Sequence, residues 1–232
     1  MIRIIPSLIL IAFTICACSS KSKGPVAEAP PPIFQASPES TPLPLTVSSA
    51  PKLSEVQEAV KRVFKDAAVI DSNYNPNFVA GDFNGDASQD IAVVLKPAKL
   101  EEMNQELPPW LVREPRNEKI SRAHAKIEKD EVVLAVIHGF GANHWRDPEA
   151  TQTFVLKNVV GNGLKVQSPN EFVTANSGRK LPRPQGDLIE GVVQGTPGYL
   201  YYAKATYSWY DPKTFKGDDA PGGVFHKSRT MR

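Results

Sequence analysis

Apolar residues recur at helical spacing in the segment after residue 53, and charged residues occupy the positions between them. Ser54 and Gln57 stand three residues apart at its start, which is the spacing of a capping box. The pattern therefore predicts one amphipathic helix that stops near Asp71, where turn-forming residues gather. Its apolar face consists of Val56, Ala59, Val60, Val63, Phe64 and Ala67.

Strand patterns follow this helix as short apolar or alternating runs. Residues 132–137 are apolar on both faces, so they predict a central strand covered by the helix on one side and by a second layer or loops on the other. Residues 195–198 read as a short turn, and no helix of crossover length is evident. We expect an α+β fold with a mostly antiparallel sheet and one N-terminal helix. The predicted strands are residues 78–83, 91–96, 132–140, 153–160, 188–194 and 199–210.

One predicted connection is unusually long. Residues 97–130 are rich in charge and proline, and connections of this length are commonly binding loops or disordered segments. They contain the stretch Leu107-Pro108-Pro109-Trp110. Trp110 either docks on a partner or folds back over the sheet edge, and we favour the second interpretation.

The first residues have the pattern of a secretory signal. Arg3 gives a positive start, and residues 4–14 form an apolar run that is too short to span a bilayer. Residues 15–18, Ile-Cys-Ala-Cys, resemble a bacterial lipobox, which implies that Cys18 is acylated and becomes the mature N-terminus. Ser19 resembles the sorting pattern of outer-membrane lipoproteins. The alternative is an ordinary signal peptide with two incidental thiols.

The segment between this signal and the predicted helix has the composition of a tether. Pro, Ser, Ala and Thr dominate it, and large apolar side chains are too few to form a core. Proline keeps such a segment extended, so it would hold a folded domain away from a membrane. The chain is therefore expected to have three parts: a lipoprotein signal peptide at 1–17, a lipidated tether at 18–52 and a single α+β domain at 53–232.

The cysteine count bears on how the domain is stabilised, and the charge balance bears on its partners. Cys16 and Cys18 are the two cysteines of the chain, so the domain is expected to fold without a disulfide. A domain of well over 100 residues buries enough apolar surface to do so. Lys and Arg number 27 against 25 Asp and Glu, without a basic stripe, which argues against a nucleic-acid partner.

Oxygen-bearing side chains alternate through residues 82–90, which we call the acidic loop. Its sequence is Asp-Phe-Asn-Gly-Asp-Ala-Ser-Gln-Asp. Calcium loops carry side-chain oxygens at alternate positions and a backbone carbonyl at the seventh. Neighbouring carboxylates also repel one another unless a cation neutralises them. The loop is therefore a predicted Ca²⁺ site. Its ligands would be the side chains of Asp82, Asn84, Asp86 and Asp90 and the carbonyl of Ser88.

The surrounding residues 81–93 resemble the calcium-binding core of FG-GAP or VCBS-type repeats, G-D-x-N-G-D-G-x-x-D-[LI]-A-V. The resemblance implies a bacterial lipoprotein with a single repeat, whose calcium loop joins two strands, and it implies metal roles for the same five residues. The loop is not an EF-hand, because Val93 stands where that motif needs Glu and a strand pattern follows Asp90. The matching positions are Gly81, Asp82, Asn84, Gly85, Asp86, Asp90, Ile91, Ala92 and Val93.

Two features separate this stretch from the repeat pattern. Ala87 replaces a glycine, and its methyl group costs about 1–2 kcal/mol if the backbone is left-handed there. No second D-x-N-x-D occurs in the sequence, so a propeller of several blades is not expected. The alternative to a calcium loop is a hairpin turn at Asn84-Gly85 with its acidic neighbours facing solvent. A bound cation would more often staple the turn than take part in chemistry.

Residues 138–141, His-Gly-Phe-Gly, raise an enzyme hypothesis. They look like the loop that follows a strand in α/β-hydrolases and supplies an oxyanion-hole amide. An esterase of this kind needs a G-x-S-x-G elbow, and the sequence has none. It also needs a later histidine, and His226 is the only histidine after residue 145. The alternative is that Gly139 and Gly141 let a buried strand turn sharply, with His138 and Phe140 closing the end of the sheet.

The leading hypothesis is a lipid-anchored cell-envelope protein, in the outer membrane, with a non-enzymatic binding or structural role; the esterase is the alternative. Its expected partners are the membrane, through the lipid, and an envelope protein or a glycan. Residues 199–210 concentrate Tyr and Trp, which form either a platform for a sugar or peptide or a packed core face.

Overall fold

The computed structural model describes residues 49–117 and 125–217, which all belong to one compact unit of the chain. The predicted signal peptide, Cys18, residues 18–48 of the tether and His226 lie outside the described residues. The described elements are α1 (Leu53–Phe64), β1 (Ala68–Ile70), β2 (Phe78–Gly81), β3 (Asp90–Pro97), α2 (Leu100–Met103), β4 (Leu111–Arg113), β5 (Val133–Ile137), the 3-10 helix η1 (Gly141–Asn143), β6 (Thr153–Leu156), β7 (Asn162–Gln167), α3 (Pro169–Ala175), β8 (Leu188–Val193), β9 (Thr196–Ala203) and β10 (Thr206–Tyr210).

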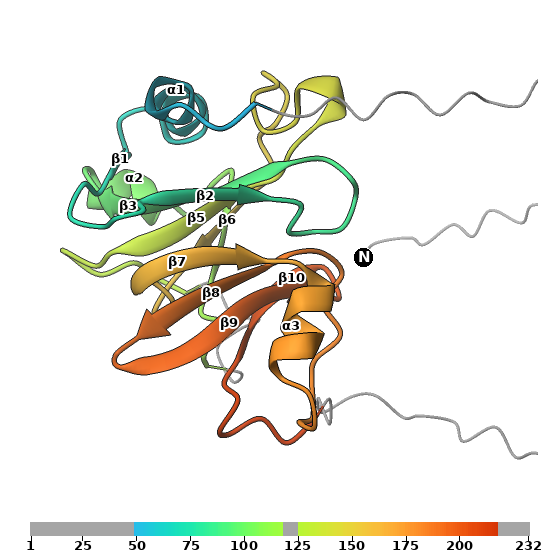
Figure 1. The fold of residues 1–232 in the computed structure, drawn as a ribbon. Coiled ribbons are helices and arrows are strands. Elements are labelled where there is room, and N and C mark those ends of the chain that lie inside the picture. The colour runs from blue at the N-terminus through green and yellow to red at the C-terminus, as the bar shows by residue number, and fades with distance from the viewer. Residues whose placement is uncertain (1–48, 118–124, 218–232) are drawn as a thin grey trace, which may run out of the picture. The chain divides into compact units, whose positions relative to one another are not determined.

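Two stacked sheets form the centre of the domain (Figure 1). The first has the order β1-β3-β5-β6-β4, with β2 also pairing with β3, and the second has the order β10-β9-β8-β7. Every pair is antiparallel except β4 with β6. α1 packs on the outer face of the first sheet, and α3 packs on the second. A mixed fold with mostly antiparallel sheets confirms the coarse form of the expected class.

The central strands of the first sheet are apolar on both faces because both faces are covered. Side chains of β3 and β5 alternate between α1 and the second sheet, as the period of two of a strand requires. β5 lies in the middle of the sheet, as its apolar run predicts. The helix-facing residues are Ile91, Val93, Leu95, Val133, Ala135 and Ile137. The residues that face the second sheet are Ala92, Val94, Leu134 and Val136.

The helices differ from the expectation of a single one. α1 begins at Leu53 and ends at Phe64, well before Asp71, because Lys65 adopts a positive φ of 53° and the chain then enters β1. Its first turn is closed by Glu55, whose carboxylate accepts the Lys52 amide, rather than by Ser54 and Gln57. The two further helices, α2 and α3, are short. No helix in the described ranges has the length and apolar character needed to cross a bilayer.

The C-terminal strands correct two expectations. The turn before β9 is formed by Gln194 and Gly195, both with positive φ, and residues 196–198 already belong to the strand. Residues 199–210 are a hairpin rather than one strand, with positive φ at Lys204 and Ala205. This changes which aromatic residues share a face. Tyr202, Tyr207 and Trp209 pack between the sheets, and Tyr199, Tyr201 and Tyr210 pack against α3, so these aromatics contribute to two core faces.

The long connection between β3 and β5 is tied to the core by Trp110. Its side chain is 4% exposed and its ring lies 4.9 Å from that of Phe64 on α1, as the folded-back interpretation predicts. The connection also contributes α2 and the edge strand β4, which pairs in parallel with β6. Leu107, three residues earlier, is 89% exposed.

We predict that Trp110→Ala lowers the free energy of unfolding by about 3–5 kcal/mol, because it empties a large apolar site between this connection and α1. Urea unfolding followed by circular dichroism measures the change. Leu107→Ala is the matched control and should stay within about 0.5 kcal/mol of wild type. Equal effects of the two substitutions would contradict the assigned packing.

Candidate functional site

The acidic loop connects β2 to β3 and contacts two distant segments of the domain. β2 and β3 pair in antiparallel fashion up to Gly81 and Asp90, so the loop closes the end of this hairpin. The first residues after β2 contact the chain before β8, and the last residues before β3 contact the chain after β5. The five sequence-predicted ligand residues therefore lie together at one junction, whose geometry follows below.

Asp82 organises the first half of the loop through its carboxylate. Oδ1 accepts the amides of Gly85 at 2.8 Å and Asp86 at 3.1 Å, and Oδ2 accepts the amide of Ala87 at 2.9 Å. Short polar side chains favour such turns because their oxygens reach backbone amides two to five residues ahead. Ala87 has a φ of 66°, so the residue that replaces the repeat glycine does adopt the left-handed conformation.

The middle of the loop is held by a second set of local hydrogen bonds. The Asn84 oxygen accepts the Asp86 amide at 3.1 Å, and the Asn84 side-chain amide donates to Asp86 at 2.9 Å. The other Asp86 oxygen accepts the Ser88 amide at 2.8 Å. Asp86 is solvent-exposed, whereas Asn84 is half-buried. The middle of the loop is therefore ordered by its own side chains and remains accessible to solvent.

Asp90 is the buried carboxylate of the loop and links two loops to each other. Its side chain is 0% exposed. Oδ2 accepts the amides of Phe83 at 2.9 Å and Asn84 at 3.3 Å, and Oδ1 accepts the amide of Gly139 at 2.7 Å. Burial raises the pKa of Asp90 to about 7, against the opposing effect of these amides.

The segment before β8 packs directly on the first turn of the loop. The Asp82 amide donates to the carboxylate of Asp187 at 3.1 Å, and the Asp187 amide donates to the carbonyl of Asp82 at 2.7 Å. Gly186 makes this approach possible, because any β-carbon there would collide with the Asp82 carbonyl oxygen. Burial also raises the pKa of Asp187. The acidic loop is thus fixed to the second sheet as well as to the first.

The segment after β5 holds the other end of the loop. The Gln89 amide donates to Nδ1 of His144 at 3.1 Å, and the Trp145 amide donates to the Gln89 carbonyl at 3.0 Å. Nδ1 of His144 is therefore an acceptor, and its ring proton lies on Nε2. The Ser88 hydroxyl also lies 3.3 Å from this Nδ1. Because the amide already occupies the single lone pair of Nδ1, His144 is poorly placed to act as a base toward Ser88.

His138 lies in the core between the two sheets. It is 2% exposed, and burial lowers the pKa of its imidazole. Nδ1 lies 3.4 Å from the Asn84 side-chain amide, and Nε2 lies 2.9 Å from the hydroxyl of the buried Tyr207. A neutral His138 with its proton on Nε2 satisfies both neighbours. Phe140, which we expected to close the end of the sheet, is 57% exposed instead.

The carboxylates of the acidic loop have no cationic partner within the described chain. Four ion pairs connect described residues, and none of them includes a loop carboxylate. The negative charge of Asp86 raises the pKa of Asp90 further. Negative charge is therefore concentrated at this junction and offset only by amide dipoles.

Three or more His, Cys, Asp or Glu side chains arranged to hold a metal ion were not found in residues 49–117 and 125–217. The hydrogen bonds give a reason, because both oxygens of each loop carboxylate are directed toward amide groups. The donor chemistry nevertheless fits a hard cation. A carboxylate has about four lone-pair positions, and none of the three loop carboxylates uses all of them. Calcium binding at this loop stays a prediction.

Sequence reasoning missed several residues that complete the junction. Asp187 does not belong to a D-x-N-x-D pattern, and only the fold brings it beside Asp82. Trp145, whose indole N–H donates to Gln89 of the loop, carries no motif that would connect it with the loop. Such residues are identified by contacts between segments more than 50 positions apart, and a single sequence does not show these contacts.

Comparisons of the chain with models of protein families, with curated proteins and with solved structures found no match. The interpretation of the acidic loop therefore depends on its own residues and geometry.

The raised pKa of Asp90 predicts a pH dependence of stability in calcium-free buffer. The folded protein holds the Asp90 proton up to about pH 7, whereas the unfolded chain releases it near pH 3.8. Folding therefore takes up a proton between these values, and the free energy of unfolding should fall as pH rises from 4 to 7, by on the order of 4 kcal/mol for this group.

Urea unfolding of wild type and Asp90→Asn, with a chelator present, tests this prediction across that pH range. Asn at this position does not titrate, so the variant should lack the Asp90 contribution, and the difference between the two proteins should change with pH. His138 titrates in both proteins and cancels. A difference that stays constant between pH 4 and 7 would contradict the raised pKa.

Proposed function

We propose that this chain is a lipid-anchored cell-envelope protein with a non-enzymatic binding or structural role, whose domain is stapled by calcium at the acidic loop. The observation that supports the staple most strongly is the position of the loop. Its residues contact the chain after β5 and the chain before β8, and its carboxylates lack a cationic partner among the described residues. A divalent cation would neutralise charge at the point where the two sheets meet.

The ligands in this proposal are the side chains of Asp82, Asn84, Asp86 and Asp90 and the carbonyl of Ser88. The resemblance to a single FG-GAP or VCBS-type repeat supports this assignment. When bound, calcium would supply positive charge and coordination bonds to oxygen. The chain's own residues hold the carboxylates in place through backbone amides, and Asp187 holds the peptide of Asp82. The role is structural, because neither His138 nor His144 has a free lone pair directed at the loop.

The esterase hypothesis gains no supporting observation from the same region. Its oxyanion donor would be the Gly139 amide, which instead donates to Asp90 at 2.7 Å. His138 is buried and pairs with Tyr207. We therefore keep the binding or structural role as the proposal, with an envelope protein or a glycan as the partner and without a nucleic-acid partner.

Calcium at 100 times its dissociation constant should raise the melting temperature by roughly 5–10 °C for a domain of this size. Asp86→Ala should remove most of this rise, because Asp86 is the exposed ligand whose loss disturbs the core least. Differential scanning calorimetry with and without chelator measures the shift, and isothermal titration measures the heat of binding. Asp66→Ala, an exposed carboxylate outside the loop, is the matched control and should keep the full shift.

A wild-type domain that shows neither binding heat nor a calcium-dependent shift would refute the staple. Equal shifts in wild type and Asp86→Ala would place any bound calcium elsewhere in the molecule.

Lipidation predicts that cells fed an alkyne analogue of palmitate will label the protein and that it will sediment with membranes. Cys18→Ser should abolish both the label and the sedimentation, because the acylated thiol is gone. Cys16→Ser is the matched control and should retain both, since this residue is removed with the signal. Unchanged labelling of Cys18→Ser would refute the proposed anchor.

A further inference from the structure

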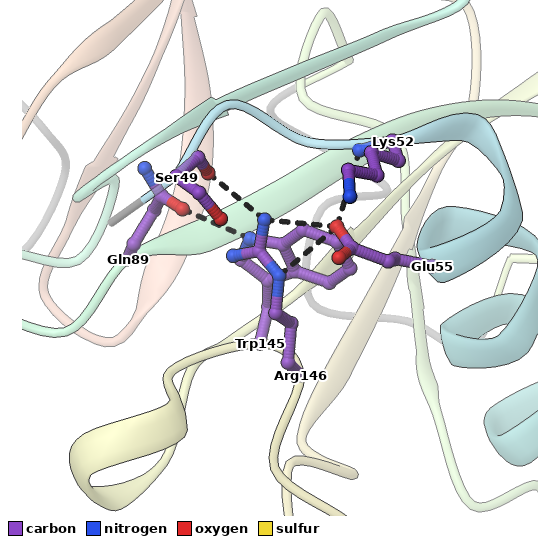
Figure 2. A network of polar contacts seen from close by, with 6 residues as sticks. All are labelled: Ser49, Lys52, Glu55, Gln89, Trp145 and Arg146. Carbon is purple, nitrogen blue, oxygen red and sulfur yellow. Dashed lines mark hydrogen bonds and ion pairs between the residues drawn. The ribbon is translucent and has the colours of Figure 1, made fainter.

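Arg146 connects the first residues of the folded domain to its interior (Figure 2). Its Nη2 donates to the carbonyl of Ser49 at 2.9 Å. Nε and Nη2 both donate to one carboxylate oxygen of Glu55, at 3.1 and 3.0 Å. These are charge-assisted bonds from one planar group, which are stronger and more directional than neutral ones. We call Ser49, Glu55, Trp145 and Arg146 the Arg146 clamp.

The N-terminal side of the clamp is held together by hydrogen bonds to the Glu55 carboxylate. The same Glu55 oxygen also accepts the Lys52 amide at 3.1 Å, which ties the residue before α1 to its first turn. This amide and the neighbouring Arg146 guanidinium hold the pKa of Glu55 below its usual value, so the pair stays charged at neutral pH. Ser49 and Glu55 are therefore both bonded to the guanidinium of Arg146, which attaches this segment to the rest of the domain.

The interior side of the clamp leads to the first sheet. The guanidinium of Arg146 lies 4.1 Å from the centre of the Trp145 ring, a cation–π distance. Trp145 is 0% exposed, and its indole N–H donates to the side-chain oxygen of Gln89 at 3.0 Å (Figure 2). Gln89 directly precedes β3, which pairs with β1, β2 and β5. A continuous series of contacts thus runs from Ser49 to a strand with three partners.

The other polar contact of α1 ends on the same segment. Nη2 of Arg62, near the C-terminal end of the helix, donates to the carbonyls of Trp145 at 2.7 Å and Ala150 at 3.2 Å. The rest of the attachment of α1 is apolar, through the side chains that it packs on the first sheet. Apolar contacts of a helix pulled from its end separate one turn at a time, so they resist such a pull weakly. Bonds at the very start of the helix have to break first.

We propose that the Arg146 clamp is a mechanical fastening, which carries tension from the N-terminal tether into the first sheet and prevents α1 from being pulled off the domain. The proposal rests on the proposed function in one respect, since a lipid anchor at Cys18 is the source of the tension. The clamp holds the chain where it enters the fold, so the force reaches β3 without first passing through the helix.

Single-molecule pulling on the full chain tests this proposal. Cys16→Ser leaves Cys18 as the single thiol, so one handle is attached there and the other at the C-terminus. Wild type should extend in one main event. Arg146→Gln should show an earlier extension at lower force, of up to roughly 60 Å, the length of the residues from 49 to 66 at about 3.5 Å each.

A second pulling geometry separates the clamp from general stability. With Asp66→Cys as the single thiol, in a chain that also carries Cys16→Ser and Cys18→Ser, the force enters after α1 and bypasses the clamp. Asp66 is exposed, so a handle can be attached there. In this geometry Arg146→Gln and wild type should have the same force profile. Lys157→Gln is the matched control, because it breaks a different ion pair, with Glu131 at 3.2 Å, and should act equally in both geometries.

Arg146→Lys keeps the charge but loses the planar group, so it should give an intermediate force for the early extension. Glu55→Gln should also lower that force, and it serves as a second test if Arg146→Gln does not fold. Early extension at the same force in wild type and Arg146→Gln, or an equal effect of Arg146→Gln in both geometries, would overturn the clamp. Absence of palmitate labelling refutes the anchor separately and leaves this measurement unaffected.

Discussion

The carboxylate of Asp90 sits where a two-faced apolar strand begins, and it accepts amides from two loops that approach from different sides. Burying a charge without a counter-ion is costly, so the group is held by three hydrogen bonds and takes up a proton more readily than a solvent-exposed carboxyl. Its hydrogen bonds connect the hairpin of β2 and β3 with the turn after β5. The fold therefore places a buried carboxylate where these two loops meet.

Much of the first sheet was predictable because strands that are covered on both faces are composed of apolar residues. β3 and β5 are apolar on both faces, as covered central strands are, and β5 lies in the middle of the sheet as its pattern predicted. β7 was missed because it is an edge strand with a register shift, and Leu164 is its only fully buried residue. α3 was missed although Ser168 and Glu171 form a capping box with Pro169 at the first helical position, a signal that the sequence does contain.

In the site, too, contacts within the loop could be predicted from the sequence and contacts with distant segments could not. The turns around Asp82 and Asp86 follow from side chains that bond amides a few residues ahead, so the order of residues in the loop largely determines them. The left-handed conformation of Ala87 agrees with the position of the glycine in the repeat pattern. The contacts with Asp187 and His144 arise from packing of distant segments, and the hydrophobic pattern does not specify which polar residues meet there. What the loop touches had to come from the fold.

The pairing of Asp82 with Asp187 spans 105 positions of the chain. A ribosome therefore has to synthesise nearly all of the described domain before the first turn of the acidic loop can acquire its last contacts. Contacts of such long range slow folding, because loop closure has to precede the gain from packing. The hairpin of β2 and β3 pairs residues that are close in the sequence, whereas the contact with Asp187 joins residues that are far apart. The contact between the acidic loop and the segment before β8 therefore forms only after the chain has been synthesised at least as far as Asp187.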